Sequence, residues 1–161
     1  MKRTTRKLPY ENATSGERAL SDMQRVLQSF GCQSFGSMMD FDRGLLVVQF
    51  RCRERQIHVE ASTAGYAKSW LAAHPWSRRM HKTREAHELE AQRVASLAVY
   101  SILRDWVKGQ VAAIETGVLS FDAAFFGQIV LASGLTALEH VAHRTTLLTA
   151  GGPVARGPTA R

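Results

Sequence analysis

The stretch that most constrains the fold runs from Arg84 to Thr116 and contains no proline. Apolar residues recur in it at intervals of three and four, which is the spacing of one face of an α-helix. They form two neighbouring stripes: Leu97, Tyr100, Leu103, Val107, Val111 and Ile114, and beside them Val99, Ile102, Trp106 and Ala113. At a rise of 1.5 Å per residue this helix is about 50 Å long. So broad an apolar face predicts a central helix covered on two sides, capped by Thr83 and ended by Gly117.

Residues 34–61 have the pattern of antiparallel strands. A candidate strand covers residues 34–40, and a turn containing Asp42 and Gly44 follows it. Apolar and polar side chains alternate over residues 45–53, and again over residues 56–61 after a tight turn at Glu54 and Arg55. The core-facing set is Leu46, Val48, Phe50, Cys52, Ile57, Val59 and Ala61. The alternation predicts a sheet with one face against the core and one face in water.

Four further helices are predicted from the Ser or Thr residues that would cap their N-termini. The expected caps are Thr14 with Glu17 at capping-box spacing, Ser62 or Thr63, Ser120, and Thr136 with Glu139 at the same spacing. The first of these helices ends at Gly31, the second stops before Pro75, and the last runs to about Leu148. Phe121, Phe125, Phe126 and Ile129 are expected to anchor the core. Gly109 lies inside the long helix, where we expect a close approach of another element or a local kink.

These elements predict an α+β fold. A small three-stranded antiparallel sheet is packed by helices, and the helical C-terminal half is built on one long helix. The expected organisation is a flexible basic arm at residues 1–12, a single domain at residues 13–149 and a flexible Gly/Pro/Arg tail at residues 150–161. No apolar run approaches the ~20 residues of a membrane span, and the basic N-terminus lacks the apolar segment of a signal peptide. We therefore expect a cytoplasmic protein without membrane contact.

No catalytic motif is present. The chain has no Gly-x-Ser-x-Gly elbow, no phosphate-binding glycine loop and no His-Glu-x-x-His pair. His140 and His143 lie three residues apart on a predicted helix, but a metal site needs three or four ligands. Cys32 and Cys52 fit a reducing compartment and form no metal motif. We predict a non-catalytic protein without a cofactor or metal ion.

The net charge of +7 is concentrated in short segments. Four of these charges belong to the arm, at Lys2, Arg3, Arg6 and Lys7. Two more lie in the tail, at Arg156 and Arg161, which leaves one for residues 10–150. Within that body, residues 74–84, "HPWSRRMHKTR", hold four Lys and Arg residues and a tryptophan without an acid. The basic character therefore belongs to the two ends and one internal segment.

This distribution indicates contact with nucleic acid. Arginines bind phosphates in a bidentate manner, and a tryptophan ring can stack on a base. The candidate contacts are Trp76, Arg78, Arg79, Lys82 and Arg84, the outward-facing strand residues Arg51 and Arg53, and the arm residues Lys2, Arg3, Arg6 and Lys7. A solvated loop explains the same segment if its cations pair with Glu85, Glu88 and Glu90 and Trp76 lies in the core.

The leading hypothesis is a basic accessory protein that contacts DNA or RNA, or a complex that handles nucleic acid. The alternative is an inhibitor or adaptor that binds a host protein, for example of a defence system, and the near-neutral body favours it. A virion structural component is a third possibility, and the oligomeric state is open. The helix–strand–strand–strand–helix order over residues 14–73 is also that of double-stranded-RNA-binding domains, although the second helix here carries only Lys68 of their Lys-rich start.

The segment from Ser101 to Glu139 resembles a recurrent pattern in small uncharacterised phage and prophage proteins. In those proteins a helix of the type L-x-x-W-h-K-x-Q-h-x-x-h-E-x-G precedes a Phe-containing helix and a "DGRT"-like turn. The matching residues are Leu103, Trp106, Lys108, Gln110, Glu115 and Gly117. The turn here is Ser133-Gly134-Leu135-Thr136, and Gly127-Gln128 replaces a Pro-Tyr pair. The resemblance implies a viral origin, hence a host cytoplasm, and transfers no activity.

Overall fold

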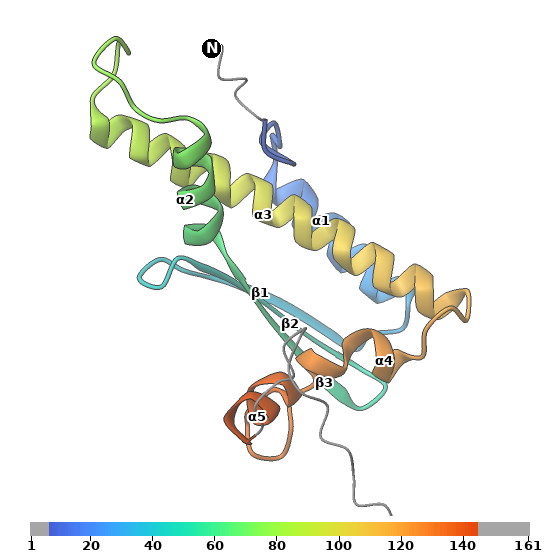
Figure 1. Ribbon diagram of the computed structural model, residues 1–161. Coiled ribbons are helices and arrows are strands. Elements are labelled where there is room, and N and C mark those ends of the chain that lie inside the picture. The colour runs from blue at the N-terminus through green and yellow to red at the C-terminus, as the bar shows by residue number, and fades with distance from the viewer. Residues whose placement is uncertain (1–6, 145–161) are drawn as a thin grey trace, which may run out of the picture.

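Helix α3 (Arg84–Glu115) runs through the molecule from end to end, and the other elements are arranged around it (Figure 1). The computed structural model describes residues 7–144. The other elements are α1 (Gly16–Ser29), β1 (Ser34–Asp40), β2 (Leu45–Cys52), β3 (Arg55–Ser62), α2 (Thr63–Ala73), α4 (Phe121–Phe125), the short 3₁₀ turn η1 (Phe126–Gln128) and α5 (Ala137–Arg144). The predicted α+β fold, with its three-stranded antiparallel sheet and long C-terminal-half helix, is confirmed.

The strands lie in the order β1–β2–β3, and both pairs are antiparallel. As the alternation predicted, Leu46, Val48, Phe50 and Cys52 of β2 are buried. The predicted wet face holds for the second half of β2, where Gln49 and Arg51 are exposed. In its first half Val47 on the same face is buried, 5% exposed. On this face the Gln49 side-chain nitrogen lies 2.8 Å from Nδ1 of His58.

Two helices pack against α3 on different halves of its length. Helix α1 lies beside the C-terminal half: a Cβ at Gly16 would lie 2.8 Å from the Tyr100 ring, and Phe30 after α1 stacks on Phe121 at 6.4 Å. Helix α2 covers the N-terminal half through a cluster of Ala67, Trp70, Ala91 and Ala95. The prediction that α3 is central and covered on two sides is therefore confirmed.

Phe125 lies at the centre of the main core, which joins α1, the sheet, α3 and α4. The ring of Phe125 is fully buried. It meets Phe50 edge to face at 5.5 Å, Trp106 edge to face at 5.7 Å and Phe121 at 5.2 Å. Trp106 therefore serves the core. Phe126, which we expected to be a core anchor, is 59% exposed instead, because the chain turns there into η1.

The predicted caps hold for four helices and fail for one. Hydrogen bonds to the side chains of Ser62, Thr83 and Ser120 cap α2, α3 and α4. Before α5, Thr136 and Glu139 form the reciprocal bonds of a capping box. Helix α1 is capped by Ser15 and not by Thr14: the backbone N–H of Arg18 donates to Ser15 Oγ at 3.2 Å. Adjacent Thr and Ser compete for this role, and Ser15 has the extended backbone of a cap.

The β2–β3 turn is formed by Arg53 and Glu54, one residue earlier than expected. Both residues have positive φ, 51° and 63°, as a two-residue hairpin of this twist requires. A non-glycine residue pays about 1–2 kcal/mol for this conformation. The Arg53 guanidinium lies 5.2 Å from the centre of the Phe30 ring and 5.8 Å from that of Phe121. These cation–π contacts offset part of the turn's cost.

Several expectations fall outside the described residues. These are the end of the last helix near Leu148, the tail at residues 150–161, and the arm residues Lys2, Arg3 and Arg6. Among residues 7–144, no helix combines the length and the apolar character needed to cross a membrane.

Gly109 lies on the exposed side of α3, and the expected close approach of another element is wrong, because a Cβ added there meets no atom within 4 Å. We expect Gly109→Ala to raise the free energy of unfolding by about 1 kcal/mol, since alanine is the better helix former. Urea denaturation measures the change. Gly117→Ala is the matched control and should destabilise the protein, because Gly117 has a φ of 73° just after the helix. A higher free energy of unfolding in both variants would contradict this explanation.

Candidate nucleic-acid interface

The basic segment 74–84 is a loop that joins α2 to the N-terminus of α3 (Figure 1). Helix α2 stops at its C-cap His74 because Pro75 has no N–H to continue the helix. Helix α3 starts after Thr83, whose hydroxyl accepts from the N–H of Ala86 at 3.1 Å. The loop therefore projects at the end of the molecule where the long helix begins.

A buried histidine holds the base of this loop. His87, in the first turns of α3, is 1% exposed, and its Nε2 donates to the carbonyl oxygen of His74 at 2.7 Å. The Trp70 ring lies between the two histidines, 4.5 Å from His74 and 5.0 Å from His87. Nδ1 of His87 has no hydrogen-bond partner and lies 3.9 Å from the carboxylate of Glu90. The loop ends are thereby fixed to α2 and α3.

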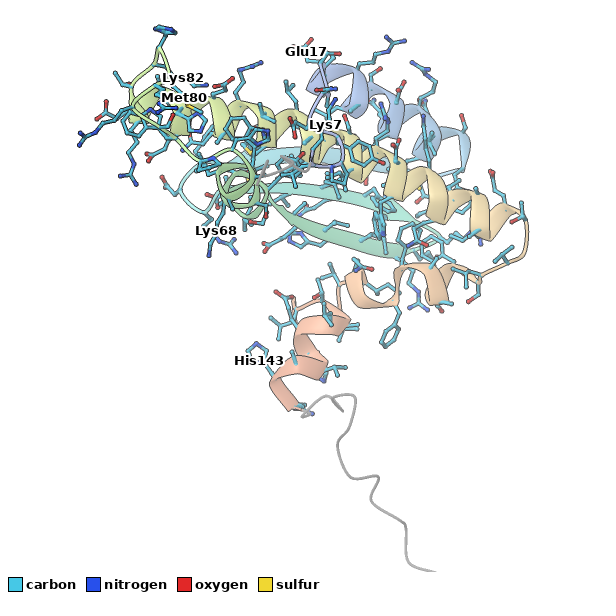
Figure 2. The ribbon with its side chains drawn as sticks, turned by 45° about the horizontal axis from the view of Figure 1, so that its top comes forward. Lys7, Glu17, Lys68, Met80, Lys82 and His143 are labelled. Atoms are coloured by element: carbon cyan, nitrogen blue, oxygen red, sulfur yellow. The ribbon has the colours of Figure 1, made fainter. Side chains whose placement is uncertain are left out.

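Trp76 closes the loop across its width. Its indole N–H donates to the carbonyl oxygen of Lys82 at 3.0 Å, and the N–H of Met80 donates to the carbonyl of Ser77 at 3.0 Å. Trp76 is 37% exposed, so part of its ring stays open to a ligand while the nitrogen is bound within the loop. Figure 2 labels Met80 and Lys82 in this loop, at the end of α3.

Two of the four cations in the loop are paired. Lys82 forms an ion pair with Glu90, and Arg84 pairs with Glu88 one turn later at 3.1 Å. The hydrogen bond from Lys82 lowers the pKa of Glu90 below its ordinary value. Since folding lowers this pKa, the pair stabilises the loop at neutral pH and weakens as the pH falls through the lowered value. The ion pairs of Lys82 and Arg84 agree with the interpretation of this segment as a solvated loop whose cations pair with nearby glutamates.

Arg78 and Arg79 stand apart from this pairing. Both are exposed at the loop tip, and within residues 7–144 neither lies within ion-pair distance of a carboxylate. Their guanidinium groups are therefore accessible to an external anion.

The basic arm joins the body next to this loop. Leu8 packs against the Ala67, Trp70, Ala91 and Ala95 cluster, and the hydroxyl of Tyr66 donates to the carbonyl oxygen of Pro9 at 2.6 Å. Nε2 of His74 lies 3.3 Å from the carboxylate of Glu11. Residues 8–12 were expected in a flexible arm, yet in the structure they contact α2 and α3. Lys7, labelled in Figure 2, is the last cation before this anchored stretch.

Tyr10 attaches residues 8–12 to a second point on α3. Its hydroxyl donates to Asp105 at 2.9 Å, and Asp105 also accepts from Arg104 at 2.7 Å. The bond to Asp105 raises the pKa of Tyr10, and the bond from Arg104 lowers the pKa of Asp105. Asp105 is therefore a paired carboxylate in a structural contact.

Arg51 and Arg53 are not brought to the loop. They lie at the β2–β3 turn, where Arg53 covers Phe30 and Phe121 beyond the C-terminal end of α3. Loop 74–84 precedes the N-terminal end of the same helix, so the two groups are separated by its length. The structure places Trp76, Arg78, Arg79, Lys82 and Arg84 at the N-terminal end of α3 and Arg51 and Arg53 at the other end. Lys7 lies between them, beside Ser101 and Arg104 near the middle of the helix.

A separate open groove of about 540 Å³ lies between the β1–β2 turn, α2 and α3. Its lining mixes charges of both signs, including Asp42, Lys68 and Glu88, with apolar Phe41 and Leu71. Among the described residues, no three His, Cys, Asp or Glu side chains lie together as metal ligands would.

The anchoring residues are what sequence reasoning missed. His87 could have been found, because with Ala91, Ala95 and Ala98 it continues a stripe at intervals of four, four and three residues. The contacts of Pro9 with Tyr66 and of Tyr10 with Asp105 join residues 57 and 95 positions apart. No local periodicity marks such long-range contacts.

Comparison with known proteins returned no match among protein-family models, curated proteins or solved structures.

Proposed function

We propose that this chain is a non-catalytic basic accessory protein that contacts nucleic acid, or a complex handling it, through loop 74–84 and the N-terminal arm. The observation that carries the proposal is the exposed, unpaired arginine pair at the tip of loop 74–84, with a second basic segment attached to the body beside the base of that loop. The pair is Arg78 and Arg79, and Lys7 opens the arm where Leu8 docks on α2 and α3. Lys2, Arg3 and Arg6 precede Lys7 in the sequence.

The geometry suits phosphate contact better than base-specific readout. Exposed guanidinium groups on a loop closed by Trp76 can bind a backbone phosphate, and the exposed part of the Trp76 ring can stack on an unpaired base. No described helix carries an unpaired row of arginines that could enter a groove. Binding is therefore expected to depend little on sequence and to favour single strands.

The test is fluorescence anisotropy with labelled single-stranded and double-stranded DNA and RNA over a salt series. If about five phosphates are neutralised, log Kobs falls with log salt at a slope of about −4 to −5 on duplex DNA and about −3.5 on a single strand. Undetectable binding at low salt, about 50 mM, would end the proposal, because the counterion-release term is strongest there.

The alternative is an adaptor or inhibitor that binds a host protein, and one observation favours it. The pairing of Lys82 with Glu90 and of Arg84 with Glu88 leaves the loop with two unpaired arginines, fewer than a continuous basic face requires. Affinity capture from host lysate with and without nuclease separates the two functions. A stoichiometric protein that survives nuclease supports the adaptor. The resemblance over Ser101–Glu139 is the basis for proposing a phage origin and a host-cytoplasmic setting.

A further inference from the structure

Strand β1 is the free edge of the sheet. The other edge, β3, pairs with a short segment after η1, since the N–H of Val130 donates to the carbonyl oxygen of Gln56 at 2.8 Å and Ile129 bridges Ile57. Within residues 7–144 no segment pairs with the outer edge of β1. Its backbone donors and acceptors on that side are available to another strand.

β1 also lacks the usual protection of an edge strand. Natural edges carry lysines, prolines or bulges that block pairing. The strand "SFGSMMD" has no Lys, Arg or Pro, and its single charge is Asp40 at its last position. Met38 is 59% exposed on the strand, and Phe41, directly after it, is 88% exposed. A seven-residue edge strand with one charge and an exposed methionine can accept a further strand through its free backbone groups.

The sequence of β1 is complementary to itself in one antiparallel register. A two-fold axis at Ser37 places each Ser37 opposite its copy, because Ser37 is the middle residue of Ser34–Asp40. In this register Met38 of one copy lies opposite Gly36 of the other. A Cβ at Gly36 meets no atom within 4 Å, so the space beside it is free for the methionine.

The same register matches the two faces of the sheet. On the inner face Phe35 comes opposite Met39 of the other copy, and both are partly buried core residues. On the outer face Asp40 comes opposite Ser34 of the other copy, whose β2 neighbour is Arg51. Asp40, whose Oδ1 accepts from the N–H of Arg43 at 2.9 Å, thus lies one strand away from Arg51 of the other copy, in both halves of the dimer.

A hollow beside β1 lies where the exposed Phe41 would arrive. Opposite Phe41 stands Gln33 of the other copy, on the same side of the sheet as Phe35. There a depression of about 180 Å³ is lined by apolar Leu27, Cys32 and Phe35 and by polar Gln24, Gln28, Gln33 and Ser34. Each copy therefore carries both an exposed aromatic side chain and a partly apolar depression in corresponding places.

We infer that β1 pairs with β1 of a second copy about a two-fold axis at Ser37, which joins the two three-stranded sheets into one continuous antiparallel sheet. The occupant of the edge is this chain itself, because the register brings Phe35 opposite Met39 and places Met38 opposite the open position at Gly36. It also brings Asp40 to the side of the sheet and the end of the strand where Arg51 lies. The inference is independent of nucleic-acid binding.

Light scattering on the full chain tests the dimer. The chain mass is 17.9 kDa, and the expected species is twice that mass and dissociates on dilution over about a hundredfold concentration range. Met38→Lys should give the monomer, since it removes an apolar contact and adds a charge to the edge. Leu138→Lys, at a site 55% exposed in α5, which lies beside the opposite sheet edge β3, adds the same charge and should remain dimeric. Circular dichroism confirms that both variants fold.

Cross-linking fixes the register. With Ser37→Cys the two new thiols lie opposite each other at the axis, with Cβ atoms about 4.5–5.5 Å apart. Diamide, which accepts the two electrons and two protons, should convert this variant to a covalent dimer. Met39→Cys is the matched control and should not cross-link, because Met39 faces Phe35 of the other copy. A wild-type monomer at every concentration, a dimer that survives Met38→Lys, or equal cross-linking of both cysteine variants would each overturn the inference.

Discussion

Phe125→Ala is expected to lower the free energy of unfolding by about 3–5 kcal/mol, the usual cost of truncating a fully buried aromatic side chain. Phe125 is 0% exposed and contacts Phe50 of the sheet, Trp106 of α3 and Phe121 of α4. Three elements from distant parts of the chain meet on this one ring. The substitution removes the transfer free energy of the ring and leaves a cavity that three rigid elements cannot close.

The loss is a large share of the total, because domains are stable by only about 5–15 kcal/mol. It corresponds to a fall in melting temperature of roughly 10 °C. Guanidinium denaturation followed by tryptophan fluorescence measures it, with Trp106 next to the altered ring as a reporter. Phe126→Ala is the control, since the neighbouring Phe126 is 59% exposed. Equal losses in the two variants would show that burial of Phe125 is not what stabilises the α4 region.

Replacing Arg78 and Arg79 together with alanine is expected to weaken nucleic-acid binding by about 100-fold at low salt, since each lost phosphate contact costs about tenfold near 50 mM. The slope of log Kobs against log salt should become shallower by about 2. The loss should be the same for all sequences, because the arginines contact the backbone. Both residues are exposed, so the stability of the protein should change little.

A matched double variant shows whether position matters. Arg51→Ala with Lys108→Ala removes the same charge from two exposed residues away from the loop, one on β2 and one on the C-terminal half of α3. We expect its affinity to stay near that of the wild type. Equal weakening of both variants would mean that net charge, and no local site, governs binding. Unchanged affinity in the Arg78 and Arg79 variant would show that the loop makes no contact and would leave the arm as the candidate binding segment.

Local patterns were enough to predict the elements, because each element is signalled by residues close in the chain. The alternation from Leu45 gave the strand and its buried face, and Thr83 and Gly117 marked the ends of α3 correctly. Errors of one residue arose where two neighbours suit the same role. Thr14 and Ser15 can both cap a helix, and the hairpin turn moved from Glu54–Arg55 to Arg53–Glu54.

The arrangement of the candidate site depended on contacts that the sequence does not signal. The pairing of Arg84 with Glu88 has helical spacing and is one of the pairings that the solvated-loop interpretation predicted. The pairing of Lys82 with Glu90 spans eight residues across the helix start, so it required the loop to fold back. The docking of Leu8 beside Trp70 depends on tertiary structure in the same way.

The length of α3 sets the footprint of a ligand that would contact both ends of the molecule. Its 32 residues at 1.5 Å each give about 48 Å between loop 74–84 and the region of α4, which equals about 14 base pairs of B-form duplex at 3.4 Å per step. An oligonucleotide shorter than this can occupy one end of the molecule and leave the other untouched. The length of the shortest oligonucleotide that binds with full affinity therefore shows whether the ligand contacts one end of the molecule or both ends.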